Sequence, residues 1–240
     1  MAWMQRQSII TGPLLKGIVF DLDGVIVDSH PAHRFAWKEF LRILGKEVAD
    51  GQLDFVMDGR KRDDILTHFL GPLNEAQLEQ YGKMKNDLFW QAVSEVPPVP
   101  GAFEFIERLY RAGITIAVAT SASTSRSHSI LSRIGLLSRF HAVVTGDEVG
   151  KGKPDPRIYR LACQRINCYP HTAVALEDAA SGVRAAKGAG MKCVGIAGHK
   201  SPQHLIAAGA DAILEDFLNI SVSEFHALVG MQPLESHIAW

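Results

Sequence analysis

Two aspartates separated by one residue, Asp21 and Asp23, follow a short apolar run and stand directly before Gly24. The run, residues 18–20, is typical of a buried parallel strand. In an open α/β sheet the ligand site lies just beyond the carboxyl ends of the strands. Two carboxylates this close repel each other, so a compensating cation is expected, and Mg²⁺ prefers oxygen ligands of this kind.

This pair also has the residue types needed for covalent catalysis. A carboxylate beside a metal can act as a nucleophile, and a neighbouring acid can serve as general acid and base. The alternative is an ordinary turn, because Asp and Gly are common turn residues. The pair alone does not decide between the two.

A hydroxyl-rich run, residues 120–125, follows a second predicted strand and leads into a helix. The amino end of a helix offers amide donors and a positive dipole to an anion. Thr120 stands at the end of the strand and Ser121 comes next. The run therefore predicts a phosphate-binding loop, with an ordinary Ser/Thr helix cap as the alternative.

Two further strand or helix boundaries carry charged residues. Lys153 precedes the sequence Pro154-Asp155-Pro156, where it can place a point charge against a phosphoryl group or a carboxylate. A solvated surface lysine is the alternative. Glu177 and Asp178 follow a predicted strand and precede a helix, which suggests a second acidic pair at the same edge of the sheet. For Asp178 the alternative is a helix cap.

The order of predicted elements gives the fold class, α/β. From Gly101 onward helices and strands alternate, which predicts a doubly wound parallel sheet. Helices are expected at residues 102–112, 125–134, 155–165 and 179–189, and strands at 114–119, 142–145, 173–176, 193–196 and 212–214. Between the first strand and Gly101, helices are expected from about residue 30 to Gly45 and at 50–57, 64–70 and 74–93, with no strand among them. We predict a core domain, residues 1–32 and 97–240, with a small helical cap domain, residues 33–96, joined by a stiff Pro-rich linker at 96–101.

In this order the four stretches resemble the four motifs of the haloacid dehalogenase (HAD) superfamily, which implies a Rossmann-like HAD core. The resemblance implies that Asp21 is phosphorylated, that Asp23 transfers protons, and that Lys153 stabilises the charge. Thr120 would bind the phosphoryl group, with Ser121 contributing its amide. The implied Mg²⁺ ligands are Asp21, Asp23, Glu177 and Asp178. Glu177 would either bind the ion directly or contact one of its direct ligands. An Asp at position 23 indicates phosphoryl transfer, since members that act as dehalogenases or ion pumps lack it.

The inserted helices resemble the cap of the β-phosphoglucomutase and phosphoglycolate phosphatase branch. That resemblance implies substrate binding by His33, Arg62 and Lys85. The alternatives are a partly buried structural histidine and solvated cations. The chain departs from the mutase pattern after the second motif, where a Ser/Thr-rich run ending in Arg126 replaces Ser-Lys-Asn.

Composition limits the remaining possibilities. A net charge of −1 gives no basic field for nucleic acid. Cys163, Cys168 and Cys193 lack metal-ligand spacing and suggest reduced thiols in a cytoplasmic protein. Residues 1–15 suggest a loosely ordered leader without a signal peptide, and no run approaches the roughly 20 apolar residues of a membrane span.

These observations predict a Mg²⁺-dependent phosphatase that acts on a small phosphorylated metabolite, a sugar phosphate, through an aspartyl-phosphate. We expect a monomer. The first alternative is a hexose-phosphate mutase of the β-phosphoglucomutase type. The second is a non-catalytic protein that binds a phosphorylated ligand on the same scaffold.

Overall fold

The computed structural model describes residues 12–93, 95–198 and 201–233. The first eleven residues of the predicted leader lie outside this part. Its last residues belong to the fold: Leu15 is fully buried, and its backbone amide donates to the carbonyl of Gln232 at 2.8 Å. Every helix in the described part is too short or too polar to cross a membrane.

The core is one parallel sheet, which confirms the predicted α/β fold class. Its six strands have the order β3-β2-β1-β4-β5-β6. Phe20 at the end of β1 lies opposite Val118 of β2 and Leu176 of β4. The loops that leave these three strands therefore start side by side. The strands are β1 (Gly17–Phe20), β2 (Ile116–Ala119), β3 (Ala142–Val144), β4 (Ala173–Glu177), β5 (Lys192–Ile196) and β6 (Ala212–Leu214).

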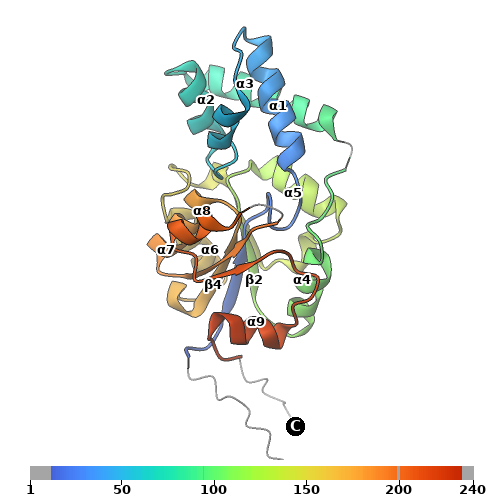
Figure 1. The fold of residues 1–240 in the computed structure, drawn as a ribbon, viewed down its shortest axis with the longest axis vertical. Coiled ribbons are helices and arrows are strands. Elements are labelled where there is room, and N and C mark those ends of the chain that lie inside the picture. Colours follow the sequence, from blue (N-terminus) through green and yellow to red (C-terminus); the bar gives the residue numbers. More distant parts are fainter. Residues whose placement is uncertain (1–11, 94, 199–200, 234–240) are drawn as a thin grey trace, which may run out of the picture.

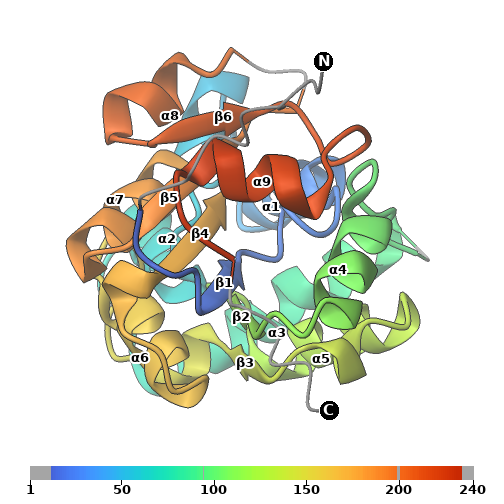
Figure 2. The same cartoon turned by 90° about the horizontal axis from the view of Figure 1, so that it is seen from below.

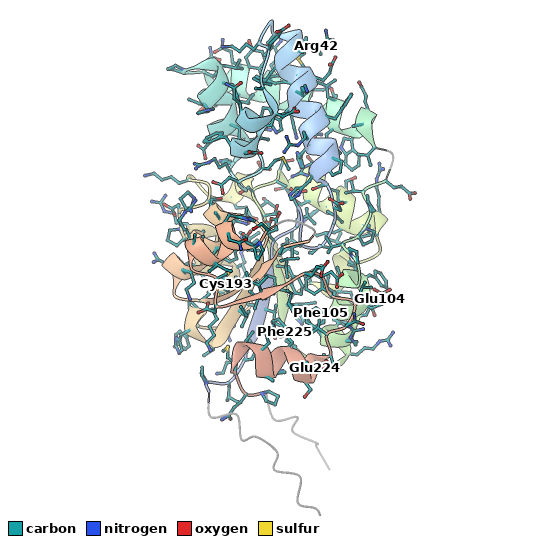
Figure 3. All side chains as sticks on the ribbon, in the orientation of Figure 1. Arg42, Glu104, Phe105, Cys193, Glu224 and Phe225 are labelled. Carbon is teal, nitrogen blue, oxygen red and sulfur yellow. The ribbon has the colours of Figure 1, made fainter. Side chains whose placement is uncertain are left out.

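Helices cover both faces of the sheet, as Figure 2 shows with α6 and α7 on one side and α4 on the other. Alternate residues of β1 feed two apolar layers: Ile18 and Phe20 belong to one, and Val19 to the other. Phe105 and Phe225, both labelled in Figure 3, pack in the first layer with ring centroids 5.4 Å apart. The helices of the core are α4 (Ala102–Arg111), α5 (Thr124–Arg133), α6 (Arg157–Arg165), α7 (Ala180–Ala189), α8 (Gln203–Ala208) and α9 (Val222–Val229).

The inserted helices form a separate layer beyond the carboxyl ends of the strands (Figure 1). They are α1 (His30–Ile43), α2 (Arg62–Leu70) and α3 (Glu75–Ala92), of which α1 and α3 make the most extensive contacts. Arg42, near the end of α1, lies far from the sheet (Figure 3). The helix predicted at 50–57 is instead a 3₁₀ segment, Asp50–Phe55. Gly51 lies within it, and glycine disfavours a regular helix.

Two chain segments join this layer to the core, and they run next to each other. Val27 forms an antiparallel bridge with Pro98. The amide of Asp28 donates to the carbonyl of Pro97 at 2.8 Å, and that of Val99 donates to the carbonyl of Ile26 at 3.0 Å. The Pro-rich return segment is thus hydrogen-bonded to the outgoing one, so any cap movement must bend both together.

Candidate active site

The loop after β1 brings its two aspartates to the centre of the sheet edge. Gly24 makes this possible, because its φ of +80° suits glycine and an added Cβ would lie 2.2 Å from a carboxylate oxygen of Asp178. Asp21 is buried, and its amide donates to the carbonyl of Leu176 on β4. The predicted first and fourth motifs are therefore in contact.

Lys153 lies at the bottom of the site, with a fully buried side chain. Its ammonium group donates to Asp21 Oδ1 at 2.8 Å, to Glu177 Oε1 at 2.5 Å and to the carbonyl of Ala119 at 3.1 Å. Although burial disfavours its charged form, the two carboxylates raise the pKa of Lys153. Burial raises the pKa of Asp21 well above its usual value, and Lys153 opposes that rise. This lysine is therefore not the solvated surface residue that the alternative required.

Asp21, Glu177 and Asp178 form one acidic group, in which one oxygen from each lies within 4.8 Å of the others. Burial raises the pKa of Glu177, and its Oε2 is buried without a hydrogen-bond partner among the described residues. Asp178 does not cap α7, whose N-cap is Ala179; its Oδ2 lies 2.9 Å from His30 Nε2. Three carboxylates with a partnerless buried oxygen fit a hard divalent cation with oxygen ligands.

Asp23 faces away from this acidic group, toward α5. Arg126 donates to both of its oxygens, at 2.9 Å to Oδ1 and 2.6 Å to Oδ2, and the Ser29 hydroxyl donates to Oδ1 at 2.6 Å. Although burial acts in the opposite direction, Arg126 and His33 hold the pKa of Asp23 well below its ordinary value. The structure therefore places the carboxylate of Asp23 with a cation, and the side-chain oxygens that lie together are those of Asp21, Glu177 and Asp178.

The hydroxyl-rich loop after β2 lies over the same edge. Thr120 is buried, and its hydroxyl oxygen accepts from the amide of Ala122 at 3.1 Å. The Ser121 hydroxyl donates to the carbonyl of Gly59 in the cap at 2.7 Å. Ser123 is the N-cap of α5, so the ordinary capping alternative holds for this residue. Thr120 and Ser121 remain in the wall of the cavity.

The three predicted substrate-binding residues face the same cavity from the cap. His33 Nε2 lies 2.9 Å from Arg126 Nη1, and its Nδ1 lies 2.7 Å from Lys85 Nζ. Burial, together with the charges of Lys85 and Arg126, lowers the pKa of His33 to about 3. Arg62 lies against α3 at Gly82, where an added Cβ would be 2.6 Å from the guanidinium carbon. The structure thus brings His33 and Lys85 next to Arg126, while Arg62 lines the same cavity from α2.

Three residues at the site did not emerge from the sequence. Arg126 marked only a departure from the mutase pattern, yet it binds Asp23. Tyr159 donates to Glu177 Oε1 at 2.5 Å, and His30 lies beside Asp178. His30 stands two residues after Asp28, so its proximity to the motif was a usable signal. Tyr159 lies on α6 among apolar residues, and nothing in the sequence pointed to its contact.

The chain is similar to known proteins along most of its length. The model of the haloacid dehalogenase-like hydrolase family matches residues 15–190. The phosphorylated carbohydrates phosphatase of Thermotoga maritima is 31% identical over 86% of this chain and 98% of its own length. The β-phosphoglucomutase of Bacillus subtilis is 29% identical over 88% of this chain and 94% of its own length.

A solved structure shares the fold. The crystal structure of β-phosphoglucomutase from Clostridium difficile superposes with a TM-score of 0.80, covering 90% of this chain and 97% of the other, at 20% identity. At that identity the likeness supports the fold alone. The family match and the two relatives go further: the chain is an enzyme that belongs to the haloacid dehalogenase-like hydrolases, with a carbohydrate phosphatase and a phosphomutase among its relatives.

Proposed function

We propose that this enzyme is a Mg²⁺-dependent phosphatase that hydrolyses a small phosphate monoester, a sugar phosphate, through an aspartyl-phosphate at Asp21. The main support is the buried arrangement around Asp21, which has two further carboxylates beside it and the ammonium group of Lys153 at 2.8 Å. The phosphorylated carbohydrates phosphatase and the β-phosphoglucomutase among its relatives favour a phosphorylated sugar. Three free thiols agree with action in the cytoplasm.

Asp21, Glu177 and Asp178 would hold the metal ion. A bound Mg²⁺ supplies positive charge next to the phosphoryl oxygens, in a site where burial strengthens electrostatic interactions. Lys153, which donates to both Asp21 and Glu177, adds a second positive charge. In this arrangement Lys153 fixes the orientation of the nucleophile and balances the charge that develops during transfer.

The reaction has two steps. Before the first step the Asp23 carboxylate takes up a proton from solvent, because its pKa is held low while Arg126 binds it. The Asp21 carboxylate then attacks phosphorus, the bond to the ester oxygen breaks, and Asp23 donates that proton to the leaving alkoxide. Asp23 then accepts a proton from water as the water attacks the aspartyl-phosphate, which releases inorganic phosphate and restores Asp21. Thr120 and Ser121 would bind the phosphoryl oxygens beside α5. The cap would exclude bulk water in the first step.

A hexose-phosphate mutase is the second candidate, favoured by the 29% identity to a β-phosphoglucomutase. It would use the same groups but return the phosphoryl group to the sugar. Measurement of products separates the two candidates, since a phosphatase accumulates inorganic phosphate and a mutase accumulates an isomeric sugar phosphate.

The test is Asp21→Asn, assayed for phosphate release from a panel of sugar phosphates with Mg²⁺. The wild type should release phosphate, and the variant should lose at least about 10³-fold in rate, because the nucleophile is gone while the shape of the side chain is kept. Asp54→Asn is the matched control, since Asp54 is an exposed cap residue. Wild-type phosphate release by the Asp21 variant, with an unchanged circular dichroism spectrum, would exclude this mechanism.

A further inference from the structure

Arg126 occupies an unusual position for a cation in the first turn of α5. It is only 7% exposed, and its guanidinium carbon lies 5.2 Å from the ring centre of Phe89 in the cap. Both of its terminal nitrogens bind Asp23, and one also contacts His33. This side chain therefore joins the core, the catalytic loop and the cap at one point.

The contact fixes the direction of the Asp23 carboxylate. Oδ2 accepts from Arg126, while Oδ1 accepts from Arg126 and from the Ser29 hydroxyl. A general acid and base needs an oxygen that can approach the ester oxygen of the substrate within hydrogen-bond distance. Oδ2 keeps one further acceptor position, but the bidentate contact holds both oxygens against the guanidinium group. Asp23 must therefore break this contact before it can turn toward the ester oxygen.

Two basic residues of the cap indicate what Arg126 would bind instead. Arg62 and Lys85 line the cavity together with Arg126. Among the described residues no carboxylate lies within ion-pair distance of Lys85, whose amine contacts His33 and lies 5.3 Å from the ring centres of Trp37 and Phe89. Burial lowers the pKa of Lys85, and the nearby charges of Arg126 and Arg62 add to that effect. Arg62 pairs with Asp63 at 2.9 Å, so of these three basic groups Lys85 is the one without a carboxylate partner in the described part of the chain.

We propose that Arg126 is a specificity-determining residue that pairs with Asp23 until a second anionic group of the substrate, a carboxylate or a second phosphate, binds its guanidinium group and releases Asp23. This inference rests on the proposed function. The planar fork of an arginine binds carboxylate and phosphate in the same bidentate manner, so the incoming group can replace Asp23 without a change in geometry. Substrates that lack the second anion would leave Asp23 bound.

The substrate class follows from this exchange. The preferred substrates would be phosphorylated sugar acids or sugar bisphosphates, in which one phosphate reaches Asp21 and the other anion reaches Arg126. Monophosphates of uncharged sugars would react more slowly, because their leaving alkoxide needs a proton from Asp23, which stays bound to Arg126. An aryl phosphate serves as an internal reference, since a phenolate leaves without such help.

The test compares the wild type with Arg126→Gln and Arg126→Lys. The four substrates are p-nitrophenyl phosphate, a hexose monophosphate without a second anion, a phosphorylated sugar acid and a sugar bisphosphate. Each kcat/KM is divided by the value of the same variant for the aryl phosphate. The wild type should favour the anion-bearing substrates, and Arg126→Gln should reduce that preference at least about tenfold, the effect of one charged hydrogen-bonded contact. Arg126→Lys should fall between them, because it keeps the charge and loses the fork. The two anionic substrates separate a carboxylate from a phosphate as the partner.

Arg133→Gln is the matched control. Arg133 lies on the same helix with its guanidinium carbon 4.6 Å from the ring centre of Trp90, and it does not line the cavity. Its ratios should equal those of the wild type. Arg126 variants that keep the wild-type preference, or that lose all substrates in equal proportion, would overturn the inference and leave the phosphatase intact. A wild type that releases phosphate from none of the four compounds would overturn the proposed function and the inference with it.

Discussion

The two sides of the cavity carry opposite charge imbalances. On the core side three carboxylates, Asp21, Glu177 and Asp178, share the buried ammonium group of Lys153. On the side that faces the cap, the three basic groups of Arg62, Arg126 and Lys85 lie near two carboxylates, Asp23 and Asp63, each of which is paired with an arginine. The core side thus lacks a cation and the cap side lacks an anion. One aspartate of the pair lies on each side: burial raises the pKa of Asp21, with Glu177 and Asp178 adding to the rise, whereas Arg126 and His33 lower that of Asp23 against the effect of burial.

The largest effect is expected where the core side loses its cation. Lys153→Met would leave Asp21 and Glu177 buried together without a counter-charge. Removing one partner of a buried ion pair destabilises a protein by about 3–5 kcal/mol, and the loss of charge stabilisation should reduce phosphate release by at least about 10²-fold. Urea denaturation and a phosphate assay measure the two effects.

Lys83→Met is the control for this change. Lys83 forms an exposed pair with Asp87 on α3, and exposed pairs contribute at most about 1 kcal/mol. If the Lys153 variant were as stable as this control, the acidic side of the cavity would not depend on its lysine, and the contrast between the two sides would fail.

The next effect concerns the metal ion expected at the acidic group of Asp21, Glu177 and Asp178. If the acidic group binds Mg²⁺, saturating metal should stabilise the wild type by about 2–3 kcal/mol at a hundredfold excess over Kd. Asp178→Asn should lose most of that gain, because it removes one charged ligand, and Asp54→Asn should keep it. Thermal unfolding with and without Mg²⁺, and after chelation, gives the comparison. Equal stabilisation of both variants would place the metal elsewhere.

The smallest of these effects tests the cap side. The pKa of His33 is about 3 in the folded protein and near 6.5 when unfolded. Between these values the unfolded chain binds the extra proton, so the free energy of unfolding should fall as the pH is lowered, by up to about 1.4 kcal/mol per pH unit from this group. Stability at pH 5 and pH 7 should therefore differ less in His33→Gln than in the wild type. An unchanged difference would mean that this imidazole is not held neutral.

The sequence predicted the core side better than the cap side, and the reason is geometric. A residue at the end of a parallel strand has a known place, so Asp21, Thr120 and Glu177 could be brought together from strand boundaries alone. The position of Arg126 depends on the rotation of α5 and on the depth of its side chain. Neither follows from local pattern.

Some missed elements did have a signal. Ser221 and Glu224 form a capping box at the start of α9, and the apolar Phe225 follows it directly. This pattern would have predicted the helix. By contrast, α8 spans only six residues, Gln203–Ala208, and its burial depends mainly on Leu205. So short an amphipathic segment gives too few turns to show a period.

The bond from Ser121 to Gly59 sets the direction of a single hydrogen atom. Because the hydroxyl donates to a carbonyl of the cap, its proton is directed away from the sheet, and a bound phosphoryl group would meet the backbone at Ser121 instead of an O–H donor. Once the two layers separate, the hydrogen bond to Gly59 is lost, and the Ser121 hydroxyl becomes available as one more donor at the loop. The number of hydrogen-bond donors at this loop is therefore a readout of whether the layers are joined.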